Sequence, residues 1–254
     1  MTFQPPAESQ RQLSGINFAL AVPFALAVKQ RFDAFDTTGT QDPNKCKALL
    51  KFPNDQAVFW SSKMAIDADG PSAGPGHLSG KQLDHGSGQD ATSLMPIGGQ
   101  QNGLPSETVP YIVLPLYSAD IHDNRPFDPL VAVGDVAVVI FKEKIAAAIC
   151  GDLGPWNKIG EASIRVHEML QSLSRLNPCL DPCTGRDANG YGETARNSSV
   201  DEDVLFFVFP KSKFADGELT YQNIETKVSE RAFHLYNVLR GATAPKGFFS
   251  RFFT

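Results

Sequence analysis

The sequence predicts a mainly β protein of the α+β class, in which a β-barrel carries a few peripheral helices. The 254 residues include 18 prolines and 21 glycines between many short apolar runs, which is typical of short strands joined by loops. Residues 136–169 read as a strand, a charged turn, a second strand, a Gly/Pro loop and an amphipathic helix. The rest of the chain is organised around this stretch.

Composition limits the classes of function. Hydrophobic residues make up 42% of the chain and charged residues 20%, as in globular proteins. The formal net charge of -5 argues against nucleic acid as the main partner and suits a cationic substrate. The apolar run at 16–28 is too short to span a bilayer, so no membrane span is expected.

That apolar run has two interpretations. It could be the apolar region of a signal peptide, with Ala25 to Ala27 as a small-residue cleavage site. However, the preceding residues carry one base, Arg11, together with Glu8, and Pro23 interrupts the run. We therefore favour a strand or helix that packs against the core.

Local patterns predict the remaining elements in order. Strands are expected at 56–60, 63–69, 109–116, 136–141, 145–150 and 204–210, and helices at 164–176 and 225–240, the second ending at Gly241. Prolines at both ends of 109–116 favour an edge or terminal strand. Residues 37–54, 71–103, 118–129 and 177–199 are expected to be loops or linkers.

These elements suggest three regions. Residues 1–54 form an N-terminal extension and linker, 55–210 a catalytic β-barrel domain, and 211–254 a C-terminal helical extension packed on the same domain.

Cysteine and histidine patterns provide no metal or cofactor site. Cys150 falls in an apolar strand, and Cys179 and Cys183 could close a small disulfide loop in an exported protein. There is no HExxH motif, no Ser-His-Asp set that spacing can select, and no phosphate-binding glycine loop. We expect neither a metal nor a cofactor.

Carboxylates are the remaining candidates for chemistry. Asp152 leaves the strand at 145–150, and Glu161, nine residues later, enters the following helix. Rigid elements joined by a short loop can hold two such side chains for catalysis. Each acid also has a structural interpretation, Asp152 as a turn residue and Glu161 as a helix N-terminal charge.

Four short motifs in order carry a resemblance to a known family. They are MAIDADG (64–70), PYIVLP (110–115), GDLGP (151–155) and GEAS (160–163). Together they resemble the fungal-type chitosanases of glycoside hydrolase family 75, over about 57–210. The resemblance implies an endo-acting, inverting hydrolase of β-1,4-linked glucosamine polymers, with Asp152 and Glu161 as its catalytic acids. It also implies that Asp67 and Asp69 face the substrate.

The residues leave several roles open. The helix dipole would favour the ionised form of Glu161 and burial against Trp156 its protonated form, and the residues leave open which effect is larger. Our interpretation is that Glu161 is the general acid and Asp152 the general base. Trp156 stacks on a sugar ring or caps the core. Asp67 and Asp69 bind substrate ammonium groups or are solvated acids beside the Gly70 turn. The loop at 153–160 is shorter than in the fungal members.

The resemblance extends to architecture and setting. The strand, GDLGP loop, GEAS and helix are similar to the central unit of double-psi β-barrels. The implied partner is chitosan or a related amino-sugar polymer, and the implied setting is extracellular or periplasmic, as a monomer. Two alternatives stay open: a hydrolase of peptidoglycan or chitin, and a non-enzymatic polysaccharide-binding barrel.

Overall fold

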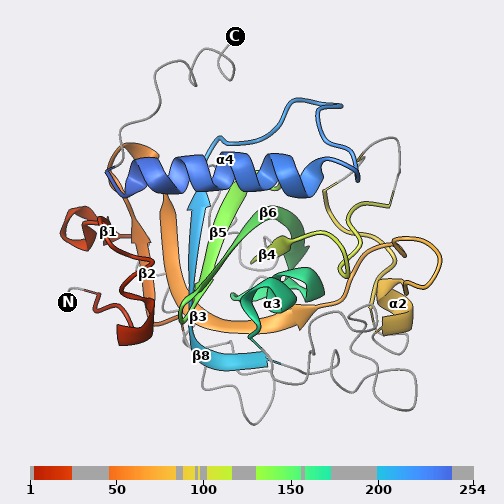
Figure 1. Ribbon diagram of the computed structural model, residues 1–254, viewed down its shortest axis with the longest axis horizontal. Helices are drawn as coiled ribbons and strands as arrows, with labels where there is room; N and C mark the ends of the chain where they lie inside the picture. Colours follow the sequence, from red (N-terminus) through yellow and green to blue (C-terminus); the bar gives the residue numbers. More distant parts are fainter. Residues whose placement is uncertain are drawn as a thin grey trace, which may run out of the picture.

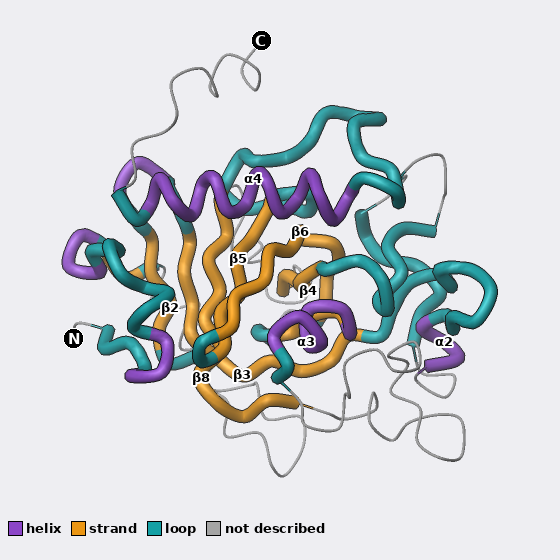
Figure 2. The backbone as a smooth tube through the Cα atoms, viewed as in Figure 1, coloured by secondary structure: helices purple, strands orange, loops and turns teal. Residues whose placement is uncertain are grey.

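The computed structural model describes residues 3–24, 46–83, 88–94, 97, 102–115, 130–155, 158–172 and 199–241. Figures 1 and 2 show strands in the centre with helices around them. The strands are β1 (Val22–Pro23), β2 (Ala48–Lys51), β3 (Val58–Asp67), β4 (Tyr111–Pro115), β5 (Val136–Phe141), β6 (Lys144–Gly154), β7 (Glu161–Ser163) and β8 (Ser199–Phe209). The helices are α2 (Gly80–Leu83), α3 (Ile164–Leu170) and α4 (Ile224–Leu239), with short 3-10 turns η1 (Ala7–Ser9), η2 (Phe18–Leu20) and η3 (Pro53–Asp55).

Six of the strands close into a mixed barrel, in the order β3-β7-β4-β6-β5-β8 and back to β3. The pairs β3–β7 and β4–β6 are parallel, and the other pairs are antiparallel. Strands β2 and β1 extend the sheet outward from β3. The predicted α+β barrel is therefore confirmed.

Alternate residues of the strands divide between two apolar cores. In β5, Ala137 and Val139 face the core that includes α3, while Val136 and Val138 face the core that includes α4. Because both faces are covered, this strand reads as one continuous apolar run instead of an alternating pattern. Figure 1 shows α4 lying across the strands on one side of the molecule.

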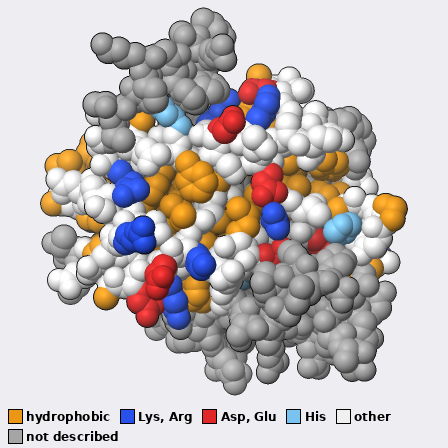
Figure 3. Space-filling view, viewed as in Figure 1, with side chains coloured by type: hydrophobic (Ala, Val, Ile, Leu, Met, Phe, Trp, Pro, Cys, Tyr) orange, Lys and Arg blue, Asp and Glu red, His pale blue; other side chains and the backbone are white. Residues whose placement is uncertain are grey.

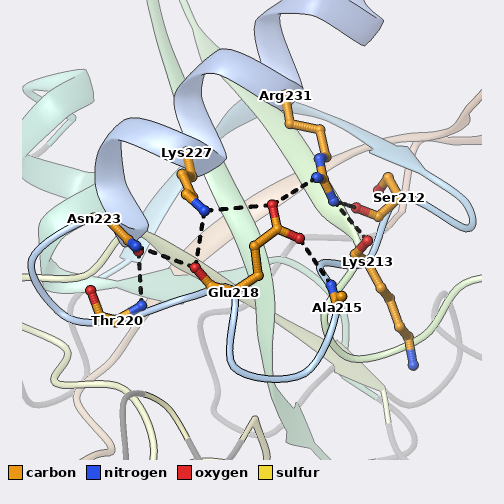
Figure 4. Close-up of polar contacts among 8 residues, drawn as sticks. All are labelled: Ser212, Lys213, Ala215, Glu218, Thr220, Asn223, Lys227 and Arg231. Carbon is orange, nitrogen blue, oxygen red and sulfur yellow. Dashed lines mark hydrogen bonds and ion pairs between the residues drawn. The ribbon is translucent and has the colours of Figure 1, made fainter. Parts of the chain in front are cut away.

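Helix α4 confirms the predicted C-terminal helix, including Gly241 with a φ of 82° directly after the C-cap. Figure 4 shows how Glu218, in the loop before α4, is fixed to the helix. Its carboxylate lies 3.4 Å from a guanidinium nitrogen of Arg231 and 3.6 Å from the Nζ of Lys227. The guanidinium of Arg231 also stacks over the ring of Phe214, at 3.6 Å. These contacts hold the loop against the helix.

The N-terminal segment packs on the same side as α4, in agreement with the favoured structural interpretation. The ring of Phe18 lies 5.1 Å from those of Phe3 and Phe59. The hydroxyl of Tyr236 donates a 2.8 Å hydrogen bond to the carbonyl of Gln12. The suggested cleavage site at 25–27 lies outside the described residues.

Three predictions about strands were wrong. The strands expected at 56–60 and 63–69 form one continuous strand, β3, because the polar pair Ser61 and Ser62 is buried within the sheet. The expected edge strand at 109–116 is β4, which lies between β7 and β6, with its prolines at the strand ends. The expected linker contains β2, which pairs with β3.

Two predicted boundaries also moved. β6 continues past Cys150 to Gly154, so Asp152 lies within the strand. Helix α3 ends at Leu170, where Gln171 takes a left-handed conformation as the C-cap. Among the described residues, no helix has the length and apolar character that crossing a membrane requires.

Candidate active site

The structure brings the four predicted carboxylates together. Oxygen atoms of Asp67, Asp69 and Asp152 all lie within 4.8 Å of one another. Glu161 is near enough for its negative charge to raise the pKa of Asp67. The fifth predicted residue, Trp156, lies outside the described residues.

Strand order explains how Asp152 and Glu161 meet. In β4, Ile112 pairs with Ala162 of β7 on one side and with Cys150 of β6 on the other. Glu161 precedes Ala162 on the antiparallel neighbour, and Asp152 follows Cys150 on the parallel one. Asp152 therefore pairs with Val113, the next residue of β4, and Glu161 lies beside the same part of β4 on its other side.

Asp152 is aimed by a β-bulge. The register of β4 and β6 shifts between Ile112 and Val113, and Gly151 is the additional residue of β6. A Cβ at Gly151 would come within 2.6 Å of the Cβ of Tyr111, so the strands approach here as only glycine allows. Bulges commonly redirect a side chain beside a functional site. Here the redirected side chain is that of Asp152.

Hydrogen bonds fix the Asp152 carboxylate on one oxygen. Its Oδ1 accepts from the backbone N–H of Ser93 at 2.9 Å, the hydroxyl of Ser93 at 2.6 Å and the N–H of Leu153 at 2.7 Å. The side chain is buried, and burial raises its pKa, while these three hydrogen bonds lower it in part. The net effect is a pKa above the ordinary aspartate value.

Asp67 and Asp69 are held by the turn that follows β3. The N–H of Asp69 donates to Oδ1 of Asp67 at 2.9 Å, and the N–H of Gln89 donates to Oδ1 of Asp69 at 2.7 Å. The Tyr111 hydroxyl bonds the carbonyl of Asp69 at 2.8 Å. Burial raises the pKa of Asp67 well above its usual value, and the charges of Asp69, Asp152 and Glu161 raise it further.

Glu161 lies in a different environment from the one predicted. It belongs to β7, and α3 begins three residues later with the Ser163 side chain as its N-cap, so the predicted helix-start position was wrong. The reason is the pairing with β3, which extends this segment before it turns into the helix. The carboxylate of Glu161 lies over Gly154, where a Cβ would be 2.8 Å from its Oε2. The Nζ of Lys158 lies 4.0 Å from Oε1 of Glu161.

Ser93 is a site residue that sequence reasoning missed. It lies in the segment expected to be a long loop without periodicity, where no spacing singles out one serine. The length of that loop was a signal of function, but it did not point to a residue. Only the fold shows that Ser93 contacts Asp152.

The other titratable candidates lie apart from the cluster or have structural partners. His77 Nδ1 pairs with Glu107 at 3.1 Å. His167 is fully buried, and burial lowers its pKa to about 4. Cys150 is a buried free thiol, as expected, and Cys179 and Cys183 lie outside the described residues.

Charge is mixed on the face that Figure 3 draws, where acidic and basic side chains of the described residues lie side by side. The carboxylate cluster brings three acidic side chains together. Among the described residues, Asp67, Asp69 and Asp152 have the spacing that could hold a cation, either a metal ion or an ammonium group.

Comparison with family models matches residues 64–230 to the fungal chitosanases of glycosyl hydrolase group 75. The chain belongs to this family. It is a chitosanase-type glycoside hydrolase, and its substrate is a polysaccharide. Comparison with curated proteins found no match.

The residues that match the chitosanase family include all four motifs. In the GEAS motif, the residues around Glu161 each have a structural role. Gly160 has a φ of 81°, and a Cβ there would be 2.2 Å from the carbonyl oxygen of Lys63. Ala162 is fully buried between β3 and β4. The Ser163 hydroxyl donates to the carbonyl of Val109 at 2.9 Å and caps α3. Three of the four residues thus hold Glu161 in place.

Proposed function

We propose that this chitosanase is an endo-acting, inverting hydrolase of β-1,4-linked glucosamine polymer. The observation that carries the proposal is the meeting of Asp152 and Glu161 beside Asp67 and Asp69, from strands on both sides of β4. Inverting glycosidases use one carboxylic acid at the leaving oxygen and one carboxylate that activates water on the opposite face.

Asp152 is the general base in this proposal. Three donors on its Oδ1 favour the ionised carboxylate and leave Oδ2 to accept a proton from water. The water then attacks the anomeric carbon, and the bond to the leaving oxygen breaks. This role requires a carboxyl separation of roughly 6.5–9.5 Å from the acid in the working enzyme.

Glu161 is the general acid. It protonates the glycosidic oxygen as the bond breaks, and so it must carry a proton when substrate binds. Asp67 lies near enough for its charge to interact with that of Glu161, and two such like charges favour a proton shared between them. The Nζ of Lys158 lies 4.0 Å from Oε1 of Glu161.

Asp67 and Asp69 bind the ammonium groups of the polymer. A protonated glucosamine unit beside these carboxylates would replace repulsion between like charges with attraction. Binding should therefore weaken with salt, and the KM for chitosan should rise between low and physiological ionic strength. A KM that does not respond to salt would argue against a cationic substrate.

The setting of the enzyme follows from its polymeric substrate. A polysaccharide substrate favours an extracellular or periplasmic setting for the enzyme. We propose that it acts as a monomer. It needs neither a metal nor a cofactor, since two carboxylates suffice for the chemistry. Dialysis against EDTA should leave the activity unchanged, and loss of activity that Ca²⁺ or another divalent ion restores would contradict this.

The deciding experiment compares three polymers. Release of reducing ends should be fast on chitosan and slow on chitin and peptidoglycan, with viscosity falling early because cleavage is internal. Faster release from chitin or peptidoglycan would assign the site to that polymer, and binding without release would indicate a polysaccharide-binding barrel. Proton NMR of fresh product should show the α-anomer first, and initial β-anomer would indicate retention.

A further inference from the structure

Residues 88–94 connect the two halves of the carboxylate cluster. At one end, the N–H of Gln89 donates to the carboxylate of Asp69. At the other end, Ser93 donates twice to Asp152, and the N–H of Leu94 donates to the carbonyl of Gly151 at 2.9 Å. The segment is therefore bonded both to the end of β3 and to the bulge of β6.

The backbone of this segment is itself fixed. The N–H of Thr92 bonds the carbonyl of Asn102 at 3.1 Å, and the Thr92 hydroxyl accepts from the N–H of Leu104 at 2.8 Å. Thr92 is buried, whereas its neighbour Ser93 is exposed. The Ser93 hydroxyl is thus presented by a fixed backbone and is not needed to fill the core.

The contacts divide the two oxygens of Asp152 between different tasks. A carboxylate oxygen has two lone pairs, and Oδ1 already receives three donors at 2.6 to 2.9 Å. A proton that Asp152 takes up must therefore go to Oδ2, the oxygen that accepts it from water in the proposed mechanism. We propose that Ser93 is a positioning residue, whose hydroxyl orients Asp152 and keeps it ionised as the base.

This inference rests on the proposed function, because it assumes that Asp152 is the base. The hydroxyl can be tested separately from the backbone contact, since Ser93→Ala removes the 2.6 Å bond and leaves both N–H donors. Because Ser93 is exposed, the substitution leaves no cavity in the core. Ser93→Thr keeps a hydroxyl and serves as the conservative variant.

Kinetics on chitosan should separate positioning from binding. In Ser93→Ala, kcat should fall about tenfold or more, because hydrogen bonds to charged groups are among the stronger ones, and KM should change by less than about twofold. The acid limb of the kcat profile should move to higher pH, since a donor that stabilises the ionised Asp152 has gone. Ser93→Thr should restore both properties.

A matched control is Ser72→Ala. The Ser72 hydroxyl is also exposed and lies within its own loop, 3.1 Å from the carbonyl oxygen of Gly74 and 3.0 Å from that of His77. It should keep the wild-type kcat and pH profile. Among the described residues, the titratable groups around Asp152 are Asp67, Asp69, Tyr111 and Glu161, and all four are unchanged in both variants.

A second readout does not depend on turnover. Carbon-13 NMR of labelled aspartate carboxyls can follow the titration of Asp152, identified by the signal that Asp152→Asn lacks. The titration midpoint should rise in Ser93→Ala and return in Ser93→Thr. An unchanged midpoint, or a kcat equal to that of the wild type, would overturn the inference while an inactive Asp152→Asn left the proposed function standing. An active Asp152→Asn would instead overturn the proposed function.

Discussion

At the scale of single residues, Asp67 is where function and stability conflict. Its carboxylate lies among Asp69, Asp152 and Glu161, and burial removes much of the water that would solvate its charge. Holding such a group ionised at neutral pH costs folding free energy. A cation bound beside Asp67, such as a substrate ammonium group, would offset this cost.

Replacing Asp67 should therefore stabilise the protein. In Asp67→Asn the Oδ1 can still accept from the N–H of Asp69, while the buried charge is gone. We expect a gain of about 1 kcal/mol at pH 7, or about 2–4 °C in Tm, together with weaker chitosan binding. Because the pKa of Asp67 is raised in the folded state, the wild type gains stability as the pH falls through that pKa. The difference in the free energy of unfolding between Asp67→Asn and the wild type should therefore become smaller at acid pH.

The control for this prediction is Asp135→Asn. Asp135 is buried and its pKa is also raised by burial, but both of its oxygens accept hydrogen bonds, from the backbone N–H groups of Ser212 and Ala132. An amide would face one of these donors with an N–H group, so this variant should lose stability. Thermal melts at pH 7 check both outcomes, and a lower Tm for Asp67→Asn would contradict the proposed cost.

The catalytic pair gives the second prediction at this scale. Asp152→Asn and Glu161→Gln should each lower kcat by at least about 100-fold, because each removes a proton-transfer group. Chitosan oligomers should still bind, as calorimetry can show, since size and shape hardly change. Asp203→Asn, which alters a surface pair with Lys47, is the control and should keep normal turnover. Near-normal activity in either site variant would remove that residue from the mechanism.

At the scale of elements, the bulge in β6 sets the direction of Asp152. Without Gly151 as an additional residue, Asp152 would continue the alternation of β6 in register with β4. The tight contact with Tyr111 allows this only because residue 151 has no side chain. The regular pairing of β6 with β4 is thus interrupted next to Asp152.

Gly151→Ala should damage the site more than the fold. The new Cβ would lie 2.6 Å from Tyr111 and 2.7 Å from Leu104, so strand β6 must shift, at a cost of about 1–3 kcal/mol. A shift of about 1 Å at Asp152 can lower kcat about 100-fold. Gly217→Ala, where nothing lies within 4 Å, should keep the activity of the folded protein. Unchanged kcat in folded Gly151→Ala would show that the bulge does not position Asp152.

At the scale of the whole molecule, His167 connects α3 to the barrel. Its Nε2 lies 3.1 Å from the carbonyl of Ala65, the β3 residue that pairs with Glu161, and its Nδ1 lies 2.8 Å from the hydroxyl of Ser172. A carbonyl only accepts, so Nε2 carries the proton of a neutral ring. Burial disfavours the charged ring.

The fold should therefore lose stability in acid through His167. Its pKa falls from 6.5 in the unfolded chain to about 4 in the fold, so the unfolded chain takes up the proton first. The loss begins as the pH falls below the unfolded value, and the contribution at pH 4 is about 3 kcal/mol. Acids with raised pKa values, such as Asp67, act in the opposite direction.

Comparison with His167→Gln isolates this contribution. A Gln can still donate to Ala65 but does not titrate, so the free energy of unfolding should vary less between pH 7 and pH 4 in the variant, although its absolute stability is lower. His234→Gln, on the half-exposed part of α4, should keep the wild-type pH dependence. Equal slopes for wild type and His167→Gln would contradict the prediction.

Local sequence patterns determined those parts of the molecule whose conformation depends on near neighbours. The strands β5 and β8, helix α4 with Gly241 and the four motifs of the family were all readable, because side-chain periodicity and capping act over a few residues. The candidate acids were also readable, since carboxylates in motifs are visible without a fold.

Only the tertiary structure decided where those acids lie. Glu161 became part of a strand because β3 was available to pair with it, and Asp152 turned into the cluster because β4 and β6 differ by one residue in register. Ser93 reached Asp152 across 59 positions of sequence. Pairing partners, register and long-range contacts depend on residues far apart in the chain, so no local pattern encodes them.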